Sequence, residues 1–337
     1  MKRLVLAPCV LCAAAAGTDA EDAGGFETKA ANGALTISKY RGSAKELLIP
    51  SAINGLPVTT IGDGAFGDRF DLTAVTIPPS LTAIGDKAFA GCSGLTTITL
   101  PSSLTAIGEG AFAGCSGLTA IAVDKRNQRY AGMDGVLFNK DMDTILAYPA
   151  GKSGASYTIP SSVTAIGNEA FSYCFNLTAV TIPPSVTTLG YMAFAGCSSL
   201  TAVTIPSSLT TIGWWAFSGC SSLTNVMIPS SLTTIGIGVF SDCSGLTNVT
   251  LPSSLTTIEW WAFSGCSGLT NVTIPPSVTK IQRGTFYDCS SLTDIMIPSS
   301  LTAIEDAAFY ACNLNPATRS EITRRFGNAP FEDDEWQ

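Results

Sequence analysis

The sequence predicts a repeat solenoid that is mainly β, built as a stack of about ten coils. One observation is a ladder of nine cysteines that recur every 23 residues, with a single longer interval of 59 residues. A second is a phenylalanine three residues before each cysteine, with one more at Phe66. Repeats of about 20 to 50 residues indicate units that bury their apolar faces by stacking. The cysteines are Cys92, Cys115, Cys174, Cys197, Cys220, Cys243, Cys266, Cys289 and Cys312.

The first half of each coil predicts a short strand. In the copy over residues 200–220, small or polar residues alternate with β-branched ones, which places Val203 and Ile205 inward. Pro206 cannot donate a hydrogen bond to a neighbouring strand, so the strand ends there.

The second half of the coil predicts another extended segment and then a tight turn. Leu209 and Ile212 point inward, Gly213 permits the turn, and residues 216–220 fit one helical or 3₁₀ turn. One coil cannot offset its own conformational entropy. We therefore expect stacked coils to join their Val, Ile, Leu and Phe side chains into one continuous core.

Both ends of the stack need a cover, because a bare terminal coil exposes its apolar face. Residues 26–60 predict an N-terminal β cap in which segments 34–40 and 46–50 pair with each other. The repeat solenoid then covers residues 61–312, and residues 313–337 form a C-terminal helical cap and tail.

A helix is predicted over residues 316–326 of this cap. Asn315 is an N-cap residue followed by proline, and Gly327 is a stop signal. We expect Ile322 and Phe326 to pack on the last coil. The side chains expected in solvent are Arg319, Arg324 and Arg325.

The 59-residue interval contains one enlarged coil, because Ile121 and Tyr157 hold equivalent strand positions 36 residues apart. The insert, within residues 124–156, predicts a β-hairpin in which segments 135–139 and 143–148 pair across a short turn. We expect this hairpin to protrude from one face of the solenoid.

Residues 1–17 are typical of a secretory signal peptide, since Lys2 and Arg3 precede an apolar run that ends in small residues. The run is shorter than the roughly 20 residues of a transmembrane helix, which disfavours a membrane anchor. Lipidation would need Cys9 or Cys12, yet neither follows the small residue that such a site requires. The predicted location is secreted, periplasmic or at the surface of a bacterial cell.

The composition argues against several functional classes. The chain has 337 residues, of which 13% are charged and 46% hydrophobic, and it contains no histidine. Imidazole serves many hydrolytic and metal sites, so its absence disfavours an enzyme. The net charge is −8 and no basic track is present, which disfavours nucleic-acid binding. We predict no catalytic residue, no metal site and no cofactor.

The aligned copies share the consensus pattern LTxVTIPxSLTxIGxxAFxxCSG, and further characteristic segments lie at residues 53–58, 134–140 and 325–327. Over residues 34–327 this pattern resembles the BspA-type bacterial surface leucine-rich-repeat family, including its treponemal members with 23-residue repeats. The resemblance implies a leucine-rich-repeat solenoid that is secreted or surface-exposed and takes part in adhesion to host or neighbouring-cell proteins. It supplies no catalytic residues to carry over.

The cysteine ladder has two interpretations. Export would permit disulfides, and coils stacked about 4.8 Å apart bring neighbouring cysteines within reach. Side chains in such a row run parallel rather than toward each other, which favours buried free thiols that act as small apolar fillers. A parallel row of single cysteines also offers no tetrahedral cluster for zinc.

The two positions between the Ile-Gly and Ala-Phe pairs vary most among the copies. In the central coils they include Tyr191, Trp214, Trp215, Trp260 and Trp261. Stacked coils would align these residues in one aromatic strip. The strip is either a recognition surface or a ladder that only packs between coils. Carboxylates on the coil edges, such as Glu109 and Glu169, are expected in solvent with no pocket nearby.

These observations predict an exported, non-catalytic leucine-rich-repeat protein that mediates protein–protein binding or adhesion at the cell surface. Its partners would be proteins, such as host or extracellular-matrix proteins, and neither nucleic acid nor a transmembrane anchor is expected. One alternative is a carbohydrate-binding module that uses the tryptophans. Another is a passive envelope protein that self-assembles into homo-oligomers.

Overall fold

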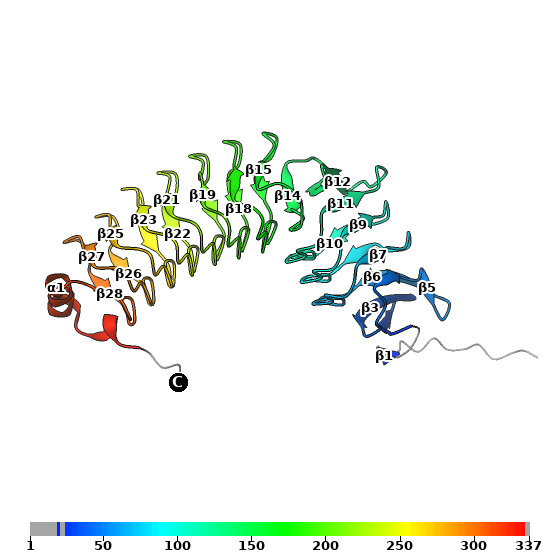
Figure 1. Cartoon of the computed structure of the whole chain (residues 1–337), viewed down its shortest axis with the longest axis horizontal. Coiled ribbons are helices and arrows are strands. Elements are labelled where there is room, and N and C mark those ends of the chain that lie inside the picture. The colour runs from blue at the N-terminus through cyan, green and yellow to red at the C-terminus, as the bar shows by residue number, and fades with distance from the viewer. Residues whose placement is uncertain (1–18, 21–23, 334–337) are drawn as a thin grey trace, which may run out of the picture.

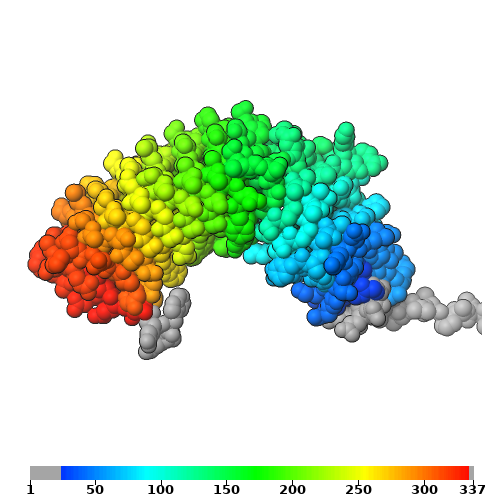
Figure 2. All heavy atoms as spheres, in the orientation of Figure 1, coloured from blue at the N-terminus to red at the C-terminus, as the bar shows by residue number. Residues whose placement is uncertain are grey.

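The computed structural model describes residues 19–20 and 24–333 of the chain. The predicted signal peptide at 1–17, with Cys9 and Cys12, lies outside the described residues. The described chain is a row of stacked β coils that curves into an arch, with the N-terminal coils at one foot and the C-terminal coils at the other (Figure 1). Figure 2 shows the same arch with its atoms filled in. The predicted solenoid is confirmed, with about 12 turns rather than ten.

A first row of strands carries the Val-Thr-Ile part of each coil. Where these strands pair they run parallel and are offset by one repeat, so that Val75 lies opposite Ile98 and Val180 opposite Val203. Their inward side chains are buried and the flanking ones exposed, as the alternation predicts. The strands are β4 (Glu46–Leu48), β7 (Ala74–Thr76), β9 (Thr97–Leu100), β11 (Ala120–Val123), β15 (Ser156–Thr158), β17 (Ala179–Thr181), β19 (Ala202–Val203), β21 (Asn225–Met227), β23 (Asn248–Thr250), β25 (Asn271–Thr273) and β27 (Asp294–Met296).

A second row of shorter strands carries the Thr-Ile part of each coil and lies toward the inner side of the arch (Figure 1). These strands also pair in parallel, with Ile84 opposite Ile107 and Ile166 opposite Leu189. The strands are β6 (Leu56–Ile61), β8 (Ala83–Ile84), β10 (Ala106–Ile107), β14 (Thr144–Ala147), β16 (Ala165–Ile166), β18 (Thr188–Leu189), β20 (Thr211–Ile212), β22 (Thr234–Ile235), β24 (Thr257–Ile258), β26 (Lys280–Ile281) and β28 (Ala303–Ile304).

The phenylalanine ladder runs through the core. Phe194 and Phe217 stack with ring centroids 5.3 Å apart and planes 3° from parallel, and the N–H of Phe194 donates to the carbonyl of Ala216 at 2.7 Å. Three other aromatic residues, which the sequence pattern does not identify, occupy equivalent positions, because the same backbone bond between coils forms at each of them. They are Tyr40, Tyr148 and Phe331, the last of these through the bond from Phe309 to Pro330.

The core is divided into two, which corrects the expectation of one continuous core. One cluster of buried side chains runs through the coils as far as Ile121 and includes Leu137 of the insert, and the other begins in the insert and reaches Ile322. The strand β13 (Val136–Asn139) separates them: Leu137 belongs to the first cluster, whereas Val136 and Phe138 belong to the second. We call the two parts the first stack and the second stack.

The insert builds this partition instead of protruding, so that part of the prediction is wrong. The predicted hairpin exists, since β13 pairs antiparallel with β14, and β12 (Tyr130–Met133) pairs with the other edge of β13. The hairpin turns inward because its own side chains are apolar, and because β14 continues the second row by pairing in parallel with β16. Buried Asn127 ties the insert to the first stack by donating to the carbonyls of Pro101 and Leu104 at 2.8 and 3.0 Å.

At the N-terminus, segments 34–40 and 46–50 do not pair with each other, contrary to prediction. The strand β3 (Ala34–Tyr40) pairs antiparallel with β2 (Phe26–Ala31) and parallel with β6, whereas β4 pairs with β7. Both segments follow the coil pattern. Segment 34–40 therefore joins the second row through β6, and segment 46–50 joins the first row through β7. The elements β1 (Asp19–Ala20) and β5 (Ala52–Ile53) add short antiparallel pairs with β2 and β6.

At the C-terminus, α1 (Pro316–Phe326) has the predicted bounds, with Asn315 as N-cap accepting from the N–H of Thr318. Ile322 is fully buried, but Arg325 is not in solvent as expected. Its guanidinium donates to the carbonyls of Pro298 and Leu301, because the last coil has carbonyls that no further coil can satisfy. The short 3₁₀ helix η1 (Ala329–Phe331) ends the described fold.

Candidate functional site

Each coil closes with a turn that follows its second-row strand, and we call the row of these turns the turn edge. The two residues before the Ala-Phe pair are the paired positions. The second paired position has a left-handed backbone, with φ of 59° at Trp215 and at Gly238. Its N–H donates to the next coil, as from Trp215 to the carbonyl of Ile237 at 2.9 Å. Backbone bonds therefore hold the turn, and the side chains at the paired positions can vary.

Tryptophans at the second paired position pack between coils. An added Cβ on Gly238 would stand 2.3 Å from Cε3 of Trp215, and one on Gly284 would stand 2.4 Å from Cδ1 of Trp261. Each indole therefore covers a glycine of the next coil, and both are half-buried. This arrangement corresponds to the packing interpretation of the strip.

Tryptophans at the first paired position are partly exposed, and the indole of Trp214 also packs on the next coil, where an added Cβ on Gly236 would stand 3.0 Å from its Cδ1. Trp214 is 56% exposed and Trp260 is 45% exposed. Trp260 meets the ring of Trp261 edge-on, with centroids 6.2 Å apart. Tyr191, in the coil before Trp214, is half-buried. The strip thus combines packing rings with exposed ones on one edge.

The turn edge is interrupted where the first stack ends. In a regular coil three N–H groups of the turn donate to the next coil. In the second repeat these are Lys87, Phe89 and Gly91, at 2.9, 2.8 and 2.8 Å. Their equivalents at the interruption are Gly110, Phe112 and Gly114, and within the described part of the chain no backbone carbonyl accepts from them. The ring of Tyr173 instead lies near Gly114, at 3.6 Å from an added Cβ.

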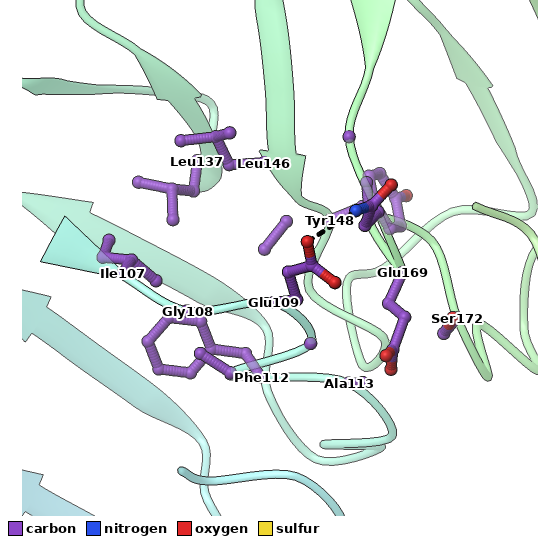
Figure 3. A pocket seen from close by; sticks show the side chains of 16 residues that line it. Ile107, Gly108, Glu109, Phe112, Ala113, Leu137, Leu146, Tyr148, Glu169 and Ser172 are labelled. Carbon is purple, nitrogen blue, oxygen red and sulfur yellow. Dashed lines mark hydrogen bonds between the residues drawn. The ribbon is translucent and has the colours of Figure 1, made fainter. Parts of the chain in front are cut away.

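A pocket of about 230 Å³, which we call the junction pocket, lies at this interruption (Figure 3). One wall is the turn over 107–113, with the ring of Phe112, and the other is the turn over 167–172. Leu137 and Leu146 of the insert contribute apolar surface between them. The pocket exists because the insert separates two turns that would otherwise stack.

Charged side chains cross the junction in place of the missing backbone bonds. Glu109 Oε1 accepts from Nδ2 of Asn168 at 2.7 Å (Figure 3). Glu169, whose side chain is 6% exposed, lies 3.6 Å from Nζ of Lys87. Its carboxylate lies against Gly110, where an added Cβ would stand 2.5 Å from Oε2. Burial raises the pKa of Glu169, and the ammonium of Lys87 opposes that shift.

The expectation that both carboxylates lie in solvent is confirmed for Glu109 and wrong for Glu169, and the expectation of no pocket nearby is wrong for both. Glu109 is exposed, but Glu169 is buried, and both line the junction pocket. The expectation assumed that every turn stacks on the next. The 59-residue interval was the available signal, because only there does a turn lack a partner one repeat away.

The cysteines lie inside the coils, as the filler interpretation predicts. The nine described cysteines are free thiols, and all but the half-buried Cys312 are buried. The thiol of Cys243 donates to the carbonyl of Phe217 at 3.1 Å, and the same bond recurs along the ladder. Burial raises the pKa of Cys243 to about 12. These thiols have a structural role in the turn.

The first-row strand face is a second accessible surface. A shallow groove of about 590 Å³ lies over β19, β21 and β23. Met227 in this groove is 70% exposed, and Met296 further along is 67% exposed. Within residues 19–20 and 24–333, no three Cys, Asp or Glu side chains are placed to hold a metal ion. The same residues contain no helix of the length and apolarity that a membrane span requires.

The repeat geometry agrees with a sequence comparison. The family described as "BspA type Leucine rich repeat region (6 copies)" matches residues 46–133, 150–243 and 216–335. The chain belongs to the BspA-type leucine-rich-repeat family. The unmatched gap between residues 133 and 150 falls within the insert that separates the two stacks of this BspA-type solenoid.

Solved structures with the same fold include a leucine-rich repeat protein from Eubacterium ventriosum. It is 26% identical, with a TM-score of 0.64, over 89% of this chain and 96% of that one. The pneumococcal vaccine antigen PcpA is 20% identical, with a TM-score of 0.58, over 88% of this chain and 69% of that one. A leucine rich cell surface protein from Faecalibacterium prausnitzii is 22% identical, with a TM-score of 0.50, over 96% and 100%.

Because the last two structures share little sequence identity with this chain, they show only that the fold is similar. No curated protein matches the BspA-type chain.

Proposed function

We propose that this BspA-type protein is exported, non-catalytic and binds other proteins at the bacterial cell surface through its turn edge. Membership of the family supports the class of function. The relative from Faecalibacterium prausnitzii is named a cell surface protein, which supports the same location for this chain. Host or extracellular-matrix proteins are the partners that we propose.

The exposed indoles of Trp214 and Trp260 carry this proposal. Burying a tryptophan contributes strongly to protein interfaces, and tryptophan is enriched among the residues that dominate binding energy. The neighbouring Trp215 and Trp261 cover glycines of the next coil, so packing accounts for them, and Trp214 packs in part on Gly236. It does not account for the exposed halves of the other two rings.

The test compares binding by the native chain with that of a Trp214→Ser, Trp260→Ser variant. Both would be passed over immobilised extracellular-matrix and serum proteins. We expect the variant to bind at least about tenfold more weakly, because two interface anchors are lost, and to remain folded with a modest fall in melting temperature, because Trp214 also packs on Gly236. The matched control is Met227→Ser with Met296→Ser, which removes exposed apolar side chains from the strand face. Unchanged binding by the tryptophan variant, or loss only in the methionine variant, would contradict the proposal.

The same exposed rings suit stacking on sugars, so a carbohydrate-binding module is the second candidate. A glycan array probed with the native chain tests it. Binding to glycans that Trp214→Ser abolishes, without binding to proteins, would favour this candidate. A concentration-dependent rise in molar mass with no external ligand would favour self-assembly instead.

A further inference from the structure

We propose that the junction pocket binds the cationic side chain of a lysine or arginine on a segment of a partner protein. The identity of the partner as a protein rests on the proposed function, whereas the chemistry of the pocket is argued independently of it.

The shape and lining of the pocket match a long cationic side chain. Phe112, Leu146 and Ala147 provide apolar surface for a methylene stem. Glu109 and Glu169 provide carboxylate oxygens for the charged head. The volume of about 230 Å³ suffices for one such side chain. The pocket is too small for a folded element and too acidic for an anion.

Glu169 is a buried charged side chain whose existing partner is weak. Its oxygen lies 3.6 Å from Nζ of Lys87, and the lysine side chain is 59% exposed. The pair is long and its lysine is largely solvated, so the attraction is weaker than that of a close, fully buried pair. The carboxylates of Glu109 and Asp86 both disfavour the charged form of Glu169. A cation that entered the pocket would relieve this repulsion, and it would compete with Lys87 for the same oxygen.

The surrounding edge also favours a basic partner segment. Acidic side chains outnumber basic ones on the turns. Between each second-row strand and the following core phenylalanine, the acidic residues are Asp63, Asp86, Glu109, Glu169, Glu259, Glu305 and Asp306, and the basic ones are Lys87 and Arg283. Tyr191 and Trp214 follow the pocket along the edge, and aromatic faces attract ammonium and guanidinium groups. A segment that carries basic residues would therefore meet complementary charge beyond the pocket.

The test titrates the isotope-labelled full chain with Nα-acetyl-L-arginine amide and follows backbone amides by NMR. The neutral analogue Nα-acetyl-L-citrulline amide has nearly the same shape and is the matched probe. We expect saturable shifts at Gly108 to Ala113 and at Asn168 to Ser172, with at least about tenfold weaker binding of the citrulline probe, because a charge-assisted bond is lost. Equal binding of the two probes, or no shift at these residues, would overturn the proposal.

Three variants make the test specific. Glu109→Gln with Glu169→Gln should weaken binding of the arginine probe about tenfold or more. Lys87→Gln should strengthen it several-fold, because the internal competitor is gone. Asp306→Asn changes an equivalent exposed carboxylate far from the pocket and should have no effect. If the double variant does not fold, the single variant Glu109→Gln replaces it. Weaker binding in Lys87→Gln, or equal loss in Asp306→Asn, would contradict a site at the junction.

These outcomes are separable from the proposed function. Binding of the arginine probe to the native chain supports the pocket even if no protein partner is found. Binding of proteins that depends on Trp214 and Trp260 supports the proposed function even if the probe does not bind.

Discussion

At the scale of single residues, each position of the repeat has one structural role. Phe217 stacks in the core, and its carbonyl accepts from the thiol of Cys243, so the cysteine fills space and satisfies a backbone group at once. The paired positions also differ: Trp215 covers Gly238 of the next coil, whereas Trp214 packs in part on Gly236 and is 56% exposed. The identity of a residue therefore follows from its offset within the repeat.

Ionisation of the buried thiols should limit stability at high pH. Burial raises the pKa of Cys243 to about 12 in the folded chain, whereas an unfolded cysteine has a pKa near about 8.5. Its contribution is fully present below the unfolded value and is lost as the pH rises toward the folded value. In this window the free energy of unfolding should fall by about 1.4 kcal/mol per pH unit for this thiol.

Urea denaturation at pH 7, 9 and 10 measures this dependence. The free energy of unfolding of the Cys243→Ala variant should fall less steeply with pH, because one ionising thiol is absent. A native chain and a variant with the same slope above pH 8.5 would show that this thiol does not set the alkaline limit.

At the scale of elements, the turns stack through side-chain volume as well as through backbone bonds. Gly238 and Gly64 occupy the same position of the repeat, with φ of 59° and 57°. The first lies under the ring of Trp215, whereas an added Cβ on the second would meet nothing within 4 Å. The pair therefore separates backbone strain from crowding.

Gly64→Ala should destabilise the chain by about 1 to 2 kcal/mol, the usual cost of a left-handed alanine. Gly238→Ala should cost about 1 to 3 kcal/mol more, because the indole must move. Thermal and urea unfolding of the two variants measures the difference. Equal losses would mean that the indole does not pack on the glycine.

The insert depends on one buried side chain. Asn127 is fully buried, donates to two carbonyls of the first stack and accepts from the N–H groups of Arg129 and Tyr130 at 2.8 Å each. Asn127→Ala should cost about 3 kcal/mol, because four bonds are lost and buried groups are left unpaired. Gln128→Ala, at the exposed neighbour, should change stability by less than about 0.5 kcal/mol. Similar losses in both variants would contradict the tethering role.

Most of the regular coil could be predicted from the sequence, because strict periodicity makes inward positions such as Val203 and Ile205 recognisable. Tyr40 and Tyr148 were missed because they replace phenylalanine at irregular spacing. The junction pocket could not be predicted, since it depends on how a non-repeating insert packs between two turns. The location of Arg325 was missed for a related reason: carbonyls of a terminal coil need donors that no repeat pattern supplies.

At the scale of the whole molecule, the chain is two stacks joined by a partition strand. The strand sides remain linked, since Asp124 and Gly151 bond to the first stack through Leu100 and Leu118 at 2.9 and 2.8 Å. The turn sides separate, and polar side chains cross the gap. In a solenoid each repeat contacts only its neighbours. A weak interface at the junction therefore lowers stability locally and leaves the packing of the other coils unchanged. The proposed cation site is a consequence of this break.

Residue-resolved amide hydrogen exchange of the native chain tests this central claim most directly. It compares the three turn N–H groups of one coil with the three equivalent groups of the next coil. The protected set is Lys87, Phe89 and Gly91, and the set at the break is Gly110, Phe112 and Gly114. We predict that the second set exchanges about tenfold faster or more, because the backbone acceptors are missing. Equal protection of the two sets would show that the coils stack without interruption and would contradict the division into two stacks.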